Sequence, residues 1–189
     1  PVWTMLVNSL KRQLDIFRNP FAFPATPNFS GYRYVLQDSD FLLYCWNTLF
    51  VVGLTSFAAL FIGSLVTYAL AFWKGRASKF VYLLFLSGIM IPIRLGTINI
   101  LQNVRSLGLM GSLYGLIPVY IAWGLPMAIF VLTTFIQELP RELIEVAEID
   151  GASRLRIYYN VILPLVRPAL GTVAIINLIN IWNDIWFPL

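Results

Sequence analysis

The sequence predicts an all-α polytopic membrane protein. Of its 189 residues, 59% are hydrophobic and 12% are charged, whereas a soluble domain usually carries about 25% charged residues. Residues 41–73 and 106–137 form runs of 33 and 32 positions without a charge. About 20 apolar residues cross a hydrocarbon core of roughly 30 Å as a helix. Continuous apolar runs, rather than alternation, favour helices over a membrane barrel.

The composition excludes several function classes. The net charge is +4, but the basic residues are spread through predicted loops, so nucleic-acid binding has no support. The sequence contains no His and a single Cys, Cys45, so we expect no metal site, no cofactor and no disulfide within the chain. The chain begins at Pro1 and ends in NDIWFPL, and we expect it to be a fragment of a longer protein.

Four complete transmembrane helices are expected in residues 1–189, which we treat as one transmembrane domain. Residues 1–10 resemble the end of an earlier span, and residues 11–40 are polar and Pro-rich, which predicts an extramembrane loop. The four predicted spans are 44–72, 80–101, 113–136 and 165–187.

Prolines interrupt the apolar pattern of two spans. Pro92 lies in the second span, beside Arg94, and Pro118 and Pro126 lie in the third. We expect these prolines to kink their helices.

Orientation follows from the distribution of Lys and Arg. Placing 74–79 and 137–167 in the cytoplasm assigns seven of the 13 basic residues to that side and six to the other. Three of the seven fall within six residues, so the positive-inside rule predicts that 74–79 and 137–163 face the cytoplasm.

The segment 137–163 is a charged island between two apolar spans. Residues 140–149 are expected to form a helix with Glu side chains near its positive end. Gly151 suits the left-handed conformation that ends such a helix. A second helix is predicted at 152–160, ended by Pro164. Two interpretations fit such an element: a plain amphipathic surface helix, or an element that docks on a partner.

The spacing of residues within the island favours one of these interpretations. Its residues fit the pattern E-A-A, three residues, Gly, nine residues, a β-branched aliphatic, any residue, Leu-Pro. The matching residues are Glu145, Ala147, Gly151, Val161, Leu163 and Pro164. This pattern resembles the coupling loop of permease subunits from binding-protein-dependent ABC importers, with Val146 where that family usually has Ala. LGLMGSLYGLIPVY (107–120) and WNDIWFPL (182–189) are similar to the maltose-transporter type of carbohydrate permease.

The resemblance implies a multi-pass plasma (inner) membrane permease, with six helices when complete, for a sugar, oligosaccharide or polyol. The implied partners are a second permease subunit, ATP-binding cassette ATPase subunits and an extracytoplasmic solute-binding protein, besides membrane lipid and the small-molecule solute. The chain has no G-x-x-x-x-G-K-[ST] loop, so we expect no enzyme activity and a separate ATPase as the energy source. The alternatives are a secondary transporter with a chance surface helix or an intramembrane enzyme, but inverted repeats and catalytic sets are not evident.

We expect the island to dock on the ATPase. Leu143 and Ile149 can supply buried apolar area, and Glu145 can make a charge-assisted hydrogen bond. The small residues Ala147 and Gly151 allow close approach. Leu163 and Pro164 complete the coupling set.

Polar residues in the spans are candidates for the substrate pathway. Offsets of three and seven residues place Asn177, Asn180 and Asp184 on one helical face, where they either line the pathway or hydrogen-bond between helices. Arg94 either snorkels outward or, alternatively, lines the pathway or pairs with an acid such as Asp184. Trp186, like Trp182, is expected on the opposite face.

Overall fold

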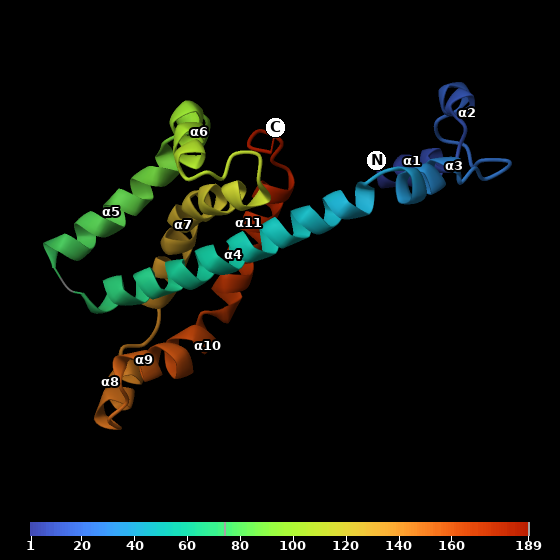
Figure 1. The fold of residues 1–189 in the computed structure, drawn as a ribbon. Helices are drawn as coiled ribbons and strands as arrows, with labels where there is room; N and C mark the ends of the chain where they lie inside the picture. The colour runs from blue at the N-terminus through green and yellow to red at the C-terminus, as the bar shows by residue number, and fades with distance from the viewer. Residues whose placement is uncertain (74, 189) are drawn as a thin grey trace. The chain divides into compact units, whose positions relative to one another are not determined.

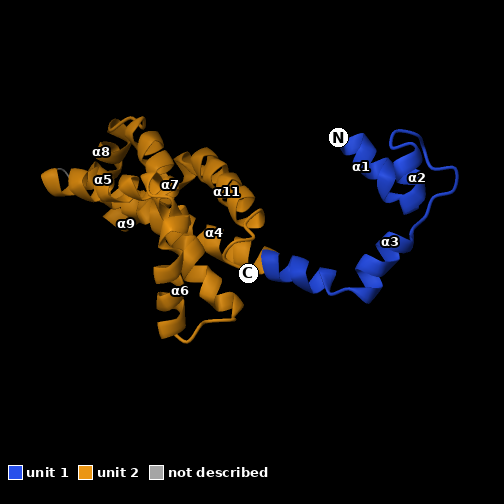
Figure 2. Cartoon of the chain, turned by 90° about the horizontal axis from the view of Figure 1, so that it is seen from above, with its two compact units in different colours: residues 1–48 blue, residues 49–189 orange. Residues whose placement is uncertain are grey.

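The structure, a computed structural model, describes residues 1–73 and 75–188, and these form helices and turns with no strand (Figure 1). Lys74, the first residue of the predicted basic turn, and Leu189 lie outside the described residues. The chain divides into two compact units, residues 1–48 and residues 49–189, with the boundary inside helix α4 (Phe41–Phe72) (Figure 2).

Besides the first turns of α4, the first unit contains only short helical segments. They are α1 (Val2–Ser9), α2 (Gln13–Arg18), α3 (Ser30–Arg33) and the π-helical turn η1 (Tyr34–Asp38). Pro20, Pro24 and Pro27 follow α2 and prevent a longer helix. The ammonium group of Lys11 donates to the Asn8 Oδ1 at 3.0 Å and to the Asn19 carbonyl at 2.8 Å, which fixes the corner after α1.

Two helices are each long and apolar enough to cross a membrane. They are α4 (Phe41–Phe72) and α7 (Leu113–Gln137), and they coincide within three residues with the expected spans 44–72 and 113–136. The Ser112 hydroxyl caps α7 by accepting the backbone N–H of Tyr114 at 3.2 Å. Pro118 and Pro126 lie inside α7 without ending it.

The expected single span at 80–101 is a bent pair of helices. Helix α5 (Arg76–Met90) ends before Pro92, and the 3-10 turn η2 (Ile93–Gly96) leads into α6 (Thr97–Ser106) at 90° to α5. Ile91 adopts an extended conformation, φ −86° and ψ 116°, because a residue before proline is driven out of the α region. The proline that we expected to kink this span therefore breaks it.

The C-terminal half contains a second bent pair. Its elements are α8 (Glu142–Ile149), α9 (Arg154–Ile157), the π-helical turn η3 (Tyr158–Ile162), α10 (Leu163–Leu165) and α11 (Arg167–Trp182). Contrary to expectation, Pro164 does not end the second island helix, which continues to Leu165 and bends by 71° at Val166. Helix α11 ends at Trp182, short of the expected residue 187. Counting each bent pair once gives up to four candidate spans among the described residues.

Helix α7 is central to the second unit, where it contacts both α5 and α11. Small residues allow this packing: a Cβ added at Gly63 of α4 would lie 2.9 Å from the Cβ of Ala128 in α7. A Cβ added at Gly88 of α5 would lie 3.0 Å from Pro126. In Figure 1, α8 and α9 lie at the end of this unit remote from α6.

Candidate functional site

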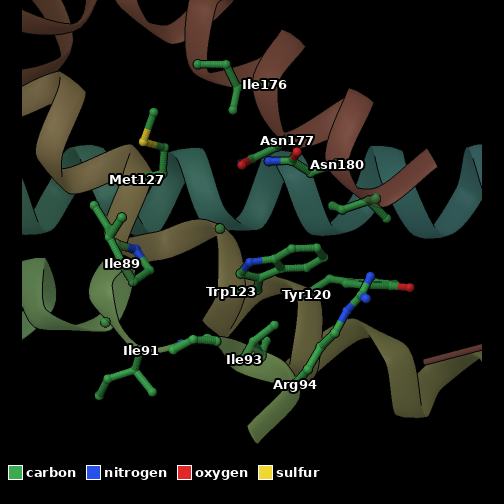
Figure 3. Close-up of a pocket in the computed structure, with 15 residues that line it drawn as sticks. Ile89, Ile91, Ile93, Arg94, Tyr120, Trp123, Met127, Ile176, Asn177 and Asn180 are labelled. Atoms are coloured by element: carbon green, nitrogen blue, oxygen red, sulfur yellow. The ribbon is translucent and has the colours of Figure 1, made fainter. Parts of the chain in front are cut away.

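A cavity of about 380 Å³ lies at the bend between α5 and η2, against α7 and α11. Its polar and aromatic lining comes from three elements: Arg94 of η2, Tyr120 and Trp123 of α7, and Asn177 and Asn180 of α11 (Figure 3). Its volume falls in the range of about 300–1,000 Å³ that is typical of small-molecule sites. An apolar wall with a few polar groups is the usual make-up of such a site.

Asn177 is the most enclosed polar group of this lining. Its side chain is 4% exposed, and its Nδ2 has no hydrogen-bond partner in residues 1–73 and 75–188. The amide fits here because Gly124 of α7 has no side chain; a Cβ at that position would lie 3.0 Å from the Asn177 Nδ2. A buried amide donor without a partner costs about 1–3 kcal/mol, so this arrangement is a cost to the stability of the fold.

Asp184 lies outside the helix that we expected to carry it. Because α11 ends at Trp182, Asp184 lies in the following turn and does not share a helical face with Asn177 and Asn180. Its Oδ2 accepts a hydrogen bond from the Tyr120 hydroxyl at 2.8 Å, and its carboxylate accepts the backbone N–H groups of Trp186 and Phe187. Asp184 thus reaches the cavity through Tyr120.

Arg94 is placed by an aromatic neighbour. Its guanidinium lies 5.5 Å from the centre of the Trp186 ring, and the Trp186 Nε1 donates to the Thr97 Oγ1 at 3.0 Å. Arg94 therefore lines the cavity beside Trp186, instead of pairing with Asp184. The structure also places Trp186 beside the cavity wall, on the side that we had not expected. These contacts join the turn after α11 to η2 and α6.

The sequence reasoning missed the α7 face of the cavity. Tyr120, Trp123, Gly124 and Met127 all line it, and their offsets of three, four and seven residues mark one face of a helix. That spacing is visible in the sequence, but in a run that is apolar on every side it does not distinguish a cavity face from a packing face.

The charged island forms two short helices around a glycine corner. Gly151 has φ +73°, a left-handed conformation that favours glycine. Its N–H donates to the Glu148 carbonyl, and the N–H of Ala152 donates to the Ala147 carbonyl, both at 3.0 Å. These bonds satisfy the last carbonyls of α8 as in a Schellman-type end. The Ser153 hydroxyl then caps α9.

The two island helices differ in burial. No residue of α8 is buried in this chain, and the predicted docking residue Ile149 is 84% exposed. Leu143 and Glu145 are also exposed, whereas Ala147 is half-buried against the core. Helix α8 therefore presents an apolar and acidic surface that this chain leaves uncovered.

Comparisons with known proteins identify the family of the chain. Residues 39–189 match the family described as binding-protein-dependent transport system inner membrane component. The chain is 31% identical over 192 residues to the multiple sugar-binding transport system permease protein MsmG of Streptococcus mutans, with all of the chain and 69% of MsmG covered. It is 30% identical over 188 residues to the diacetylchitobiose uptake system permease protein NgcG of Streptomyces coelicolor, covering all of the chain and 62% of NgcG.

A third relative is the melibiose/raffinose/stachyose import permease protein MelC of Bacillus subtilis. The identity is 29% over 188 residues, which cover 99% of the chain and 68% of MelC. The chain thus spans about two thirds of the length of these relatives.

Proposed function

The chain belongs to the family of binding-protein-dependent transport system inner membrane components, and from this premise we propose that it is part of a permease subunit that imports a sugar or oligosaccharide by ATP-driven transport. The single observation that carries this proposal is the exposed α8 helix with its Gly151 corner, at the E-A-A spacing of the coupling loop. The family assignment favours this function over a secondary transporter or an intramembrane enzyme.

Support for a carbohydrate comes from the relatives and from the cavity. MsmG, NgcG and MelC are described as permeases for sugars or oligosaccharides. The cavity combines amide groups of Asn177 and Asn180 with the rings of Tyr120 and Trp123. Amides exchange hydrogen bonds with sugar hydroxyls, and aromatic faces offer apolar contact area. We propose that Asn177, Asn180 and Arg94 line the substrate pathway and that Asp184 positions Tyr120 there.

We further propose four spans within this chain: α4, the bent pair α5–α6, α7 and the bent pair α9–α11. The resemblance implies two more helices in the complete subunit. In this topology residues 75–79 and 137–163 face the cytoplasm, and residues 11–40 and 102–112 face outward. The proposed partners are a second permease subunit, two ATPase domains and an extracytoplasmic binding protein.

The coupling element is proposed to dock in a groove of the ATPase. The exposed side chains of Leu143 and Ile149 would supply apolar area worth about 1.5–3 kcal/mol each when fully covered. Glu145 would accept a charge-assisted hydrogen bond from the partner. Ala147 and Gly151 would allow close approach, and Leu163 and Pro164 would fix where the element joins the last span.

The test is co-purification of the ATPase with the full-length permease complex. Because a hydrogen bond to a charged group contributes about 1.5–3 kcal/mol, Glu145→Ala should weaken ATPase association about 10- to 100-fold. Glu142→Ala is the matched control, since it removes the same charge from the same helix outside the motif. Equal association of both variants with the ATPase, at the wild-type level, would contradict the docking role.

A further inference from the structure

Two tyrosines fasten the second island helix to α4. The hydroxyl of Tyr158, in η3, lies 2.7 Å from the Ser64 Oγ of α4, and both residues are buried. The Ser64 hydroxyl has one hydrogen, which it donates to the Phe61 carbonyl at 2.9 Å. Tyr158 is therefore the donor to Ser64, and its ring orientation is fixed by this bond.

The second fastening lies one turn away on the same face of α4. The Tyr68 hydroxyl donates to the Arg154 carbonyl, in the first residue of α9, at 2.7 Å. Ser64 and Tyr68 are four residues apart and so lie one above the other on the helix. The rings of Tyr68 and Tyr158 pack against each other with their centres 5.3 Å apart. Two directional bonds thus hold α9–η3 in one register along α4.

The burial of the island changes abruptly at Gly151. Helix α8 contributes no buried residue, whereas Ile157, Tyr158 and Ile162 are each 1% exposed and pack with Leu132 of α7. A partner that moves α8 therefore acts on an exposed helix. The segment that follows it, α9–η3, is buried against α4 and α7.

We propose that Tyr68 and Tyr158 are positioning residues that transmit displacement of the coupling element to α4. This inference rests on the proposed coupling function of α8. Apolar contacts between the two elements are non-directional and tolerate sliding, whereas the two hydroxyl bonds fix both the register and the rotation of α9–η3. Without them α8 moves with the ATPase while α4 lags behind.

Removing either tyrosine hydroxyl is a suitable perturbation because its hydrogen-bond partner keeps another hydrogen bond. The Arg154 carbonyl also accepts a backbone N–H at the end of α9, and Ser64 keeps its bond to Phe61. Tyr68→Phe and Tyr158→Phe retain the rings and their packing. Each variant loses a bond between elements without leaving a buried carbonyl unpaired, so the complex should still assemble.

The experiment measures solute uptake per ATP hydrolysed by the complete importer in proteoliposomes, together with ATPase association. Loss of one hydrogen bond between moving parts should lower this ratio about 2- to 10-fold in Tyr158→Phe and in Tyr68→Phe, with ATPase association unchanged. Tyr159→Phe is the matched control, because Tyr159 is the neighbouring residue and is 49% exposed; its ratio should stay at the wild-type value.

A double-mutant cycle separates positioning from packing. Ser64→Ala removes the same bond from the α4 side, so Tyr158→Phe combined with Ser64→Ala should lower the ratio no further than either change alone. Normal ratios in Tyr68→Phe and Tyr158→Phe would overturn the proposal, as would loss of assembly in both variants and in Ser64→Ala. A failure of the proposed docking function is detected by a different measurement, namely wild-type association of the ATPase with the Glu145→Ala variant.

Discussion

Replacing Asn177 by Leu should stabilise the permease and impair transport. The Asn177 amide is 4% exposed, and its Nδ2 is unpaired within the described part of the chain. Removing a buried, unsatisfied polar group recovers about 1–3 kcal/mol. A somewhat larger Leu against Gly124 gives back part of this through overpacking, so we expect a net gain of about 1 kcal/mol. For 150–250 residues this corresponds to roughly 2–4 °C in Tm.

Uptake should fall in the same variant, since an amide that we propose to line the substrate pathway is gone. Thermal unfolding of the detergent-solubilised complex and uptake in proteoliposomes, measured on one preparation, test both effects. Asn180→Leu is the control for stability, because Asn180 is exposed and its replacement should leave Tm unchanged. A Tm several degrees lower in Asn177→Leu would show that the amide stabilises the packing between helices. Wild-type uptake in this variant would refute a place for Asn177 in the pathway.

Three further predictions concern glycines and topology. Gly63→Ala should lower Tm, because its Cβ would lie 2.9 Å from a Cβ of α7 and overpacking of about 1–3 kcal/mol exceeds the helix-propensity gain of about 1 kcal/mol; Gly53→Ala, with nothing within 4 Å, should raise it. Gly151→Ala should cost about 1–2 kcal/mol at its φ of +73° and reduce ATPase association; unchanged binding would mean that the corner adapts. A Cys at position 148, in a background lacking Cys45, should react with an impermeant thiol reagent only from the cytoplasmic side, and labelling from outside would invert the topology.

The sequence predicted α4 and α7 closely because both are long runs without a charge, and lipid accepts only closed, hydrogen-bonded backbone. The bends were not predicted in position. Hydropathy reports how apolar a segment is and carries no information on its direction. Pro92 signalled an interruption, but nothing in the sequence specified the 90° angle between α5 and α6. Near the C-terminus the bend falls at Val166, two residues beyond the proline that we expected to end the helix.

The candidate site was predicted only in part, because helical periodicity relates residues of one helix and not residues of different elements. Asn177 and Asn180 share a helix, so periodicity alone relates them. Asp184 lies beyond the end of α11, where helical spacing no longer applies, and it reaches the cavity through a tyrosine 64 residues earlier. Tyr158 and Ser64 are 94 residues apart. A single sequence holds no pairing information for such contacts, and this one joins η3 to α4.

Helix α7 carries both cavity residues and core residues that pack with η3, and α4 carries the Ser64 and Tyr68 contacts to α9–η3. On α7, the cavity residue Trp123 and the core residue Leu132 are nine positions apart, about 14 Å at 1.5 Å per residue. Between these levels the two helices approach each other closely at Gly63 and Ala128. Close-packed interiors transmit strain, and both helices run unbroken between these levels. We therefore propose that a displacement entering through Tyr158 passes from α4 to α7 at this contact and reaches the cavity along α7.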